Sequence, residues 1–150
     1  MTRKIFFQDK NVRIYVDTNV LRNYCTNQEK DCATLKYLFS KRDKKTLFTS
    51  TLAIAQTLSA IQKKFGKEES LKKGYYFSTK FTFLDFEEKD VMNSFEKSGD
   101  DIEDNMQYVI SQKVGCGIII SNDKSGFLKF PNVFVLKPTK KKKTISSYIA

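Results

Sequence analysis

Short apolar segments with the composition of strands alternate along this chain with longer segments of helical spacing. The predicted strands are residues 12–17, 46–50, 81–85, 115–121 and 132–136. The predicted helices are residues 18–29, 30–42, 51–65, 87–98 and 101–114. Such alternation is typical of an α/β fold, because parallel strands need long crossover connections. We therefore expect a layered α/β domain with a mainly parallel sheet.

Two segments fall outside this alternation. Residues 66–80 are rich in Lys, Gly and Ser and are predicted to form a loop or a mobile excursion. The basic residues that follow Pro138 predict a solvated C-terminal tail at 139–150. The length of 150 residues fits one domain, which we place at residues 1–138.

The location predicted from the sequence is the cytoplasm, away from membranes. No apolar stretch approaches the roughly 18 residues that a membrane span requires. At the N-terminus, Gln8, Asp9 and Lys10 interrupt the apolar run, so no signal-peptide core is expected. The three cysteines show no CxxC spacing, which favours free thiols in a reducing compartment over a disulfide framework or a zinc site.

The charge balance and the absence of histidine limit the chemistry. With 27 Lys and Arg against 17 Asp and Glu, the net charge of +10 favours a polyanionic partner such as nucleic acid. The alternative is that this charge only keeps the protein soluble. Because the chain has no histidine, Ser-His-Asp catalysis, histidine base catalysis and His-containing zinc sites are excluded.

Acidic residues stand at or just after the ends of two predicted strands. Asp17 ends the strand at 12–17, and Asp123 follows the strand at 115–121. Ligands of parallel sheets bind outside the carboxyl ends of the strands, so both acids are expected at the functional edge. Asp101 and Asp104 share a face in the first turn of the helix at 101–114. If that helix begins beside these strand ends, the carboxylates converge into a site.

Converging carboxylates in a basic protein are typical of a site for a hard cation such as Mg²⁺. A bound cation can activate water for phosphodiester cleavage without any histidine. Each acid also has an ordinary structural explanation. Asp17 could cap a helix, acids in a first helical turn complement the helix dipole, and Asp123 could be a turn residue. It is their shared position at one edge that favours a site.

Two motifs resemble those of a known family. The segment IYVDTNVLRNY resembles the first strand and helix of PIN domains, whose hallmark is a strand that ends in Asp-x-Asn. DIEDNMQYVISQKVGCGIIISNDKSGF resembles the second hallmark, a helix opening with Asp-x-x-Asp, then a buried strand and Thr-x-Asn or Thr-x-Asp. VFVLKP resembles the closing strand, so the resemblance covers residues 12–138 in matching order.

The resemblance implies a three-layer α/β/α fold and a metal-dependent ribonuclease that uses Mg²⁺ or Mn²⁺ to cleave RNA. It implies catalytic roles for Asp17, Asp104 and Asp123, which with Asp101 would be the metal ligands. Asn19 and Ser121 match supporting positions. Many small bacterial members of the family are toxins of toxin–antitoxin pairs, so an antitoxin protein and a homodimer are expected partners besides RNA. The run Lys140, Lys141, Lys142 and Lys143 would suit contact with the RNA backbone.

Two positions depart from the family pattern. Gln56 stands where the family usually has Glu, and its amide oxygen could accept a hydrogen bond or bind a metal but adds no charge. Gly126 replaces a position that is commonly acidic. These departures keep open a second reading, a catalytically weakened PIN-like module that binds RNA or a protein partner.

Two further classes are less well matched. A phosphotransferase of the haloacid dehalogenase type, with Asp17 as nucleophile, would need a second Asp where Asn19 stands. A receiver-like domain would need paired acids near the N-terminus, where Arg3, Lys4 and Ile5 stand instead.

Overall fold

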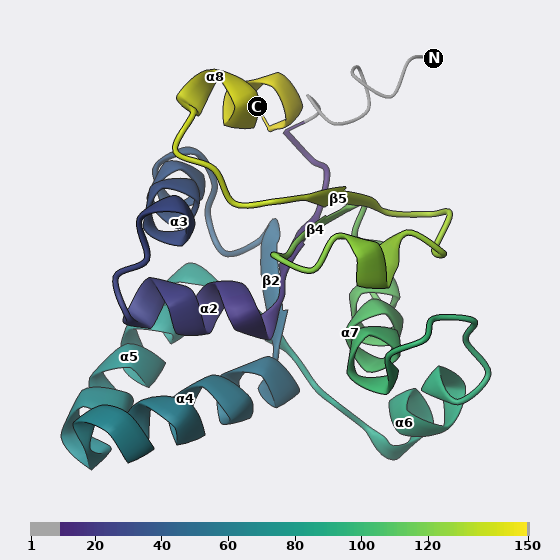
Figure 1. Ribbon diagram of the computed structural model, residues 1–150, viewed down its shortest axis with the longest axis horizontal. Coiled ribbons are helices and arrows are strands. Elements are labelled where there is room, and N and C mark those ends of the chain that lie inside the picture. Colours follow the sequence, from purple (N-terminus) through teal and green to yellow (C-terminus); the bar gives the residue numbers. More distant parts are fainter. Residues whose placement is uncertain (1–9, 150) are drawn as a thin grey trace.

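Five parallel strands form the single sheet of the computed structural model, which describes residues 10–149 (Figure 1). They are β1 (Ile14–Val16), β2 (Leu47–Ser50), β3 (Thr82–Leu84), β4 (Ile118–Ile120) and β5 (Phe134–Leu136). The spatial order is β3-β2-β1-β4-β5, and all four neighbouring pairs are parallel. The chain thus builds outward from β1 in one direction and then returns to add β4 on its other side. β1 and β4 flank the switch point, where α/β folds bind ligands.

Helices cover both faces of the sheet, which confirms the predicted three-layer α/β/α fold. They are α2 (Thr18–Cys25), α3 (Glu29–Lys41), α4 (Thr51–Phe65), α5 (Lys67–Lys80), α6 (Glu88–Ser94), α7 (Ile102–Gln112) and α8 (Lys142–Tyr148), with a short 3₁₀ helix at Ser125–Phe127. In Figure 1, α2 to α5 and α8 lie on one side of the strands, and α6 and α7 lie on the other.

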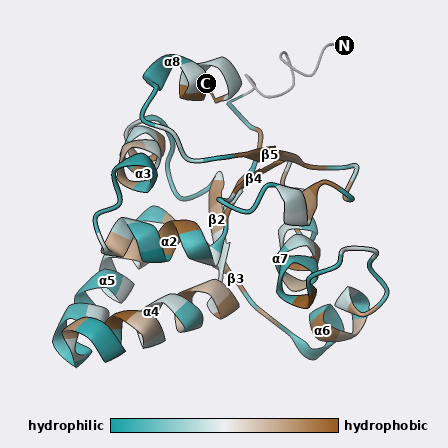
Figure 2. Cartoon of the chain, in the orientation of Figure 1, coloured by the Kyte–Doolittle hydropathy of each residue, from teal (hydrophilic) through white to brown (hydrophobic). Residues whose placement is uncertain are grey.

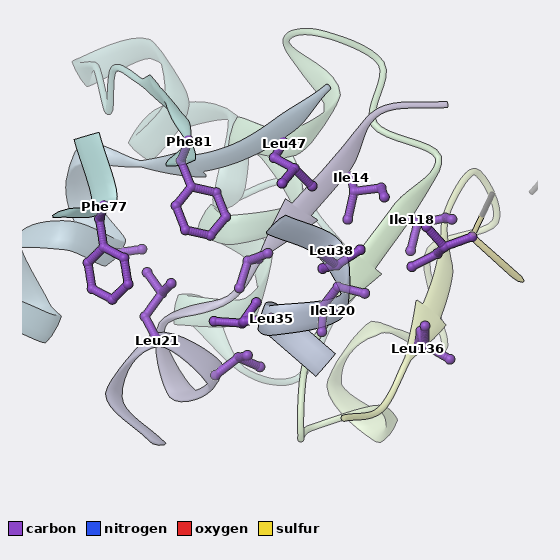
Figure 3. Close-up of a cluster of buried hydrophobic side chains, with 14 of the residues drawn as sticks. Ile14, Leu21, Leu35, Leu38, Leu47, Phe77, Phe81, Ile118, Ile120 and Leu136 are labelled. Atoms are coloured by element: carbon purple, nitrogen blue, oxygen red, sulfur yellow. The ribbon is translucent and has the colours of Figure 1, made fainter. Parts of the chain in front are cut away.

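Successive strand residues pack into two different cores. Ile14 and Val16 belong to the core under α2 to α5, of which Figure 3 shows a part, whereas Tyr15 belongs to the core under α7. Ile118, Ile119 and Ile120 alternate in the same way between the two cores. Because both faces are covered, β1, β4 and β5 consist of apolar and aromatic residues, as the hydrophobic colour of β4 and β5 in Figure 2 shows.

Residues 66–80 were predicted as a loop, and this prediction is wrong, because residues 67–80 form α5. Gly66, at a φ of 93°, ends α4, and α5 turns back along it. Gly74 brings the α5 backbone close to Leu58, since a Cβ at this position would lie 3.1 Å from the Leu58 side chain. Phe77 is fully buried in the core. Tertiary packing of one apolar side chain therefore stabilises a helix whose own composition is mainly polar.

The basic segment at 139–150 was predicted to be a disordered tail, but residues 142–148 form α8. Ile145 and Ile149 are fully buried and belong to the larger core. The hydroxyl of Thr34 in α3 donates to the carbonyl of Thr139 at 3.1 Å and accepts from its N–H at 2.9 Å. Lysines dominate the sequence of this segment, but two isoleucines and this paired contact determine its structure.

The structure bears on two of the predictions about location, the absence of a membrane span and the free cysteine thiols. The interruption of the apolar run at residues 8–10 lies almost entirely outside the described residues. Within the described part of the chain, no helix combines the length and the apolarity needed to cross a bilayer. Cys25, Cys32 and Cys116 are free thiols, as expected.

Candidate functional site

Asp17 lies at the carboxyl end of β1 and caps α2. It is 4% exposed, and its Oδ1 accepts from the backbone N–H of Thr18 at 2.7 Å. Its Oδ2 accepts from the Ser121 hydroxyl at 2.7 Å and from the Asn19 amide at 3.1 Å. The cap explanation for Asp17 is thus correct, but the contact with Ser121 also ties the carboxylate to the end of β4.

Asn19 joins the ends of β1 and β4. Its Nδ2 donates to Asp17, and its Oδ1 accepts from the backbone N–H of Asn122 at 3.1 Å. The Asn122 amide donates in turn to Asp31 of α3 at 2.8 Å, and Asp31 is 3% exposed. Asp31 is a buried member of this network that could not be selected from the sequence, because Asn122, its partner, lies far along the chain.

Asp104 and Asp123 form a second acidic pair. Asp101 caps α7, and its Oδ1 accepts from the backbone N–H of Asp104 at 3.0 Å. Asp123 is exposed and accepts from the Ser125 hydroxyl at 3.0 Å and from the Gly126 N–H at 3.2 Å. Asp104 is buried, and its Oδ2 has no hydrogen-bond partner among the described residues. A buried oxygen without a partner is costly and points to a ligand that the protein itself does not provide.

Asp17, Asn19, Asp101, Asp104 and Asp123 line one pocket of about 630 Å³ at the sheet's switch point. Its five carboxylates, called here the acidic wall, are those of Asp17, Asp101, Glu103, Asp104 and Asp123. The lining also carries hydrogen-bond donors and cations from α2 and α4, which lie across from α7 in Figure 1: Thr18, Arg22, Gln56, Ser59 and Lys63. Asn19, Ala60 and Gln107 complete the lining. The structure therefore brings together all four acids predicted from the sequence, together with Asn19 and Gln56.

The crowded carboxylates change one another's affinity for protons. Burial, followed by the neighbouring carboxylates Asp123, Asp17 and Asp101, raises the pKa of Asp104 to about 8. Burial also raises the pKa of Asp17, against the hydrogen bonds from Ser121 and Thr18. The neighbouring carboxyl of Asp104, followed by the Ser125 hydroxyl, lowers the pKa of Asp123. A proton or a cation between Asp104 and Asp123 relieves their repulsion.

We expect the melting temperature of the metal-free protein to fall as the pH rises from 5 to 8. The raised pKa of Asp104, about 8 in the folded state against about 3.9 when unfolded, means that the folded protein binds more protons in this range. The stability that this protonation contributes is present below the unfolded pKa and is lost as the pH passes the folded one. Acids with lowered pKa values titrate below this range, and the chain has no histidine to obscure the slope.

The measurement is a series of thermal melts in EDTA at constant ionic strength. Asp104→Asn should flatten the slope markedly, and the part that remains should reflect the raised pKa of Asp17. A wild-type melting temperature that rises from pH 5 to pH 8 would contradict the expectation.

Gly126 leaves room for the acidic pair. A Cβ at this position would lie 1.8 Å from Asp104 Oδ2 and 2.8 Å from Asp123 Oδ2. The sequence suggested that Gly126 weakens the site by replacing an acid, but with Asp104 in this position no side chain fits there. Glycine is therefore part of how this chain arranges its acids.

We expect Gly126→Ala to lower any cleavage activity about tenfold or more, because the Asp104 carboxyl must rotate away and small misplacements of reacting groups are costly. The displaced atoms belong to a short, rotatable side chain, so the melting temperature should change little. Cleavage rates and thermal melts of the variant test this, and an unchanged rate would show that the position of Asp104 is not critical.

A hard divalent cation fits the chemistry of this pocket. Its donors are carboxylate oxygens, which Mg²⁺ and Mn²⁺ prefer, and the unpartnered Asp104 Oδ2 lies among them. Within residues 10–149, no three acidic or thiol side chains already stand in positions to hold one ion between them. Mg²⁺ commonly combines one or two carboxylates with water and substrate phosphate, so a bound ion would need only part of the acidic wall.

Several lining residues were missed by the sequence reading. Gln56, Ser59 and Lys63 are spaced by three and four residues, so they share one face of α4. Gln56 was identified from the sequence as the departure from Glu, and this spacing could have identified Ser59 and Lys63 with it. Arg22 and Gln107 could not be selected, because only the packing of α2 and α7 brings them to the pocket.

The lysine run is not part of this pocket. Lys140 pairs with Glu29 at the start of α3, and Lys141, Lys142 and Lys143 are exposed around the first turn of α8. None of the four lines the acidic pocket. In Figure 1, α8 lies at the top of the molecule and α4 at the bottom. A contact with the RNA backbone stays a prediction for these lysines.

The fold and the site together define a three-layer α/β domain with an acidic pocket at the switch point of a parallel sheet. The PIN domain family model matches residues 14–132, and the chain belongs to this family. It is 34% identical over 103 residues to ribonuclease VapC1 of Aquifex aeolicus, an alignment that covers 69% of this chain and 58% of that protein. The chain thus spans little more than half the length of this curated relative.

Solved structures of similar fold come from bacterial toxin–antitoxin proteins. VapBC2 from Rickettsia felis, bound to a DNA fragment from its promoter, superposes with a TM-score of 0.63 at 15% identity, covering 84% of this chain and 98% of the other. A toxin–antitoxin complex from Klebsiella pneumoniae superposes with a TM-score of 0.65 at 14% identity. The match covers 85% of this chain and 99% of the other. VapC20 from Mycobacterium tuberculosis is a toxin that cleaves the sarcin–ricin loop. It superposes with a TM-score of 0.59 at 14% identity, covering 75% of this chain and 92% of the other. At these identities the likeness shows a common fold.

Proposed function

We propose that this chain is a metal-dependent endoribonuclease of the VapC type that cleaves RNA phosphodiester bonds in the pocket at the switch point. The observation that carries the proposal is the gathering of Asp17, Asp104 and Asp123 in one pocket with Arg22 and Lys63. A pocket lined by both carboxylates and cations suits a substrate phosphate that is bound through a metal ion by the carboxylates and directly by the basic side chains. The ribonuclease name of the Aquifex aeolicus relative supports the same reading.

In this proposal Mg²⁺ or Mn²⁺ would be held among Asp17, Asp104 and Asp123, by one or two of them directly and by the rest through water, with Asp101 beside them. A bound ion would supply an activated water and charge stabilisation for the leaving oxygen. The other residues act by position: Ser121 and Asn19 orient the Asp17 carboxylate, and the Asp101 cap fixes the first turn of α7, which carries Asp104.

The test is cleavage of a mixed RNA pool with Mg²⁺ or Mn²⁺, against EDTA and the variant Asp17→Asn. The proposal expects cleavage that requires metal and is lost in the variant. RNA binding without cleavage in either metal would favour the second candidate, a PIN-like module that has lost catalysis. The specific observation behind that candidate is Gln56, whose oxygen accepts from Thr18 and which adds no charge to the acidic wall.

We also propose an antitoxin protein as a partner, because the Rickettsia felis and Klebsiella pneumoniae structures are toxin–antitoxin proteins of the same fold. Exposed apolar side chains near the α4–α5 turn, Phe65, Leu71 and Tyr75, offer a surface for a protein partner or for a second copy of the chain. Light scattering of the purified protein would test the homodimer, and a monomer at micromolar concentration would argue against it.

A further inference from the structure

A chain of hydrogen bonds runs from the start of α4, through the buried side of the pocket, to Gln56. The Tyr15 hydroxyl contacts Ser50 Oγ at 2.8 Å and also Gln107 Oε1. Gln107 Nε2 donates to the Thr18 hydroxyl at 3.1 Å. The Thr18 hydroxyl donates to Gln56 Oε1 at 2.9 Å. Five side chains from β1, β2, α2, α4 and α7 are therefore linked in one series.

The direction of this series is fixed by counting protons. Tyr15 has one hydroxyl proton, and Gln107 Oε1 can only accept, so the tyrosine proton goes to Gln107. The contact between Tyr15 and Ser50 then takes its proton from Ser50, whose oxygen also accepts the Ala53 N–H at 3.0 Å. Read in this direction, every buried hydroxyl proton in the series has an acceptor.

The reverse direction would leave a buried proton without a partner. Tyr15 would have to donate to Ser50, whose oxygen already accepts from Ala53, and the proton of the fully buried Ser50 would have no acceptor among the described residues. An unpaired buried donor is costly, so the forward direction is favoured. The oxygen of Gln56 is thus turned to Thr18, and its NH₂ group is left for the pocket.

The surroundings of Gln56 on this side of the pocket suit an anion. Ser59 and Lys63 lie on the same face of α4, and Arg22 faces them from α2. Among residues 10–149, neither Arg22 nor Lys63 has an acidic partner at ion-pair distance. A second hollow of about 350 Å³ shares Arg22 with the pocket and adds Lys64, so the basic surface continues beyond it.

We propose that Gln56 is a phosphate-binding residue and not a metal ligand. Its amide NH₂ donates to a non-bridging oxygen of the RNA phosphodiester, while Arg22 and Lys63 bind the adjoining backbone. This inference rests on the proposed ribonuclease function. It gives the Gln that replaces the family's Glu at position 56 a role in binding the substrate. The loss of a carboxylate at position 56 extends the substrate-binding side chains and leaves metal binding to the acidic wall.

The experiment separates RNA binding from metal binding in the full chain. RNA affinity is measured in EDTA by fluorescence anisotropy, with a short mixed-sequence 2′-O-methyl RNA that resists cleavage. Mn²⁺ affinity is measured by calorimetry without RNA. The variants are Gln56→Ala and Gln56→Glu, and the matched control is Gln62→Ala, which removes an exposed Gln from the same helix outside the pocket.

Gln56→Ala should weaken RNA binding about tenfold or more, the usual effect of losing a hydrogen bond to a charged group, and leave Mn²⁺ affinity unchanged. Gln56→Glu keeps an oxygen for Thr18 but loses the NH₂ donor, so RNA binding should fall at least as far while Mn²⁺ binds more tightly. The control should match wild type in both assays. Lys63→Ala should also flatten the dependence of log affinity on log salt by about 0.7, whereas Gln56→Ala should not change this slope.

Weaker Mn²⁺ binding by Gln56→Ala with unchanged RNA affinity would overturn the inference, as would a wild-type protein that does not bind the RNA probe. Thermal melts show whether a variant has lost its fold. The proposed function is judged separately by wild-type cleavage. If wild type cleaves RNA but Gln56→Ala binds it normally, only the role of Gln56 fails. If the binding pattern holds without cleavage, only the ribonuclease proposal fails.

Discussion

Replacing Asp104 with Asn is expected to lower the rate of RNA cleavage by about 10³-fold, because a bound cation contributes several kcal/mol of charge stabilisation. Asp104 is 8% exposed, and its Oδ2 has no hydrogen-bond partner within residues 10–149, so it is the carboxylate most in need of a cation. Asn has nearly the same shape but carries no charge. The substitution therefore removes the interaction with metal while preserving the packing of α7.

The thermal stability of the Asp104→Asn variant is not expected to fall with its activity. At pH 8 an amide beside Asp123 removes the repulsion that raises the pKa of Asp104, so the melting temperature of the metal-free variant should equal or exceed that of wild type. A matched control is Asp100→Asn, which removes an exposed carboxylate that pairs with Lys129 at 2.9 Å outside the pocket. Such surface pairs contribute little to stability. A loss of cleavage below tenfold in Asp104→Asn, or an equal loss in the control, would remove Asp104 from the catalytic set.

The acidic wall was predictable from the sequence because it depends on strand ends. Asp17 and Asp123 each stand at or just after a run of apolar residues, and the carboxyl ends of adjacent parallel strands meet at one edge. Asp104 follows from its place in the first turn of a helix that leads into one of those strands. Local sequence and the topology rules were therefore sufficient for these three residues.

The rest of the pocket lining could not be predicted in the same way. Arg22 reaches the pocket only because α2 packs against α4, and the orientation of the Gln56 amide depends on Tyr15 and Gln107 from two other elements. The direction of a hydrogen-bond series is a property of the folded core. No spacing within one segment of the sequence carries that information.

The two errors in the fold have a common cause. α5 and α8 are both rich in lysine, and both were interpreted from composition as unstructured. In each helix, buried apolar side chains decide the outcome: Phe77 in α5, and Ile145 in α8. A few such residues among lysines produce only a weak helical pattern in the sequence. The apolar area that they bury is nevertheless sufficient to hold each helix against the core.

The largest effect on stability is expected from the C-terminal segment. Ile145→Ala should lower the free energy of unfolding by about 2–5 kcal/mol, the range for truncating a fully buried isoleucine. A chain that ends at Pro138 would lose Ile145, Ile149 and the paired contact between Thr34 and Thr139. We expect this shortened chain to be unfolded or far less stable than the full chain, so that α8 is an integral part of the domain.

Urea denaturation of the full chain, of Ile145→Ala and of the control Lys142→Ala would test this, since Lys142 is an exposed residue of the same helix. The control should change stability by less than about 0.5 kcal/mol. α8 does not contribute to the pocket, so Ile145→Ala should keep its cleavage rate at temperatures where it stays folded. If the chain ending at Pro138 unfolds at the same urea concentration as the full chain, the domain ends before α8. The helix would then be an appendage whose buried isoleucines contribute nothing to the stability of the core.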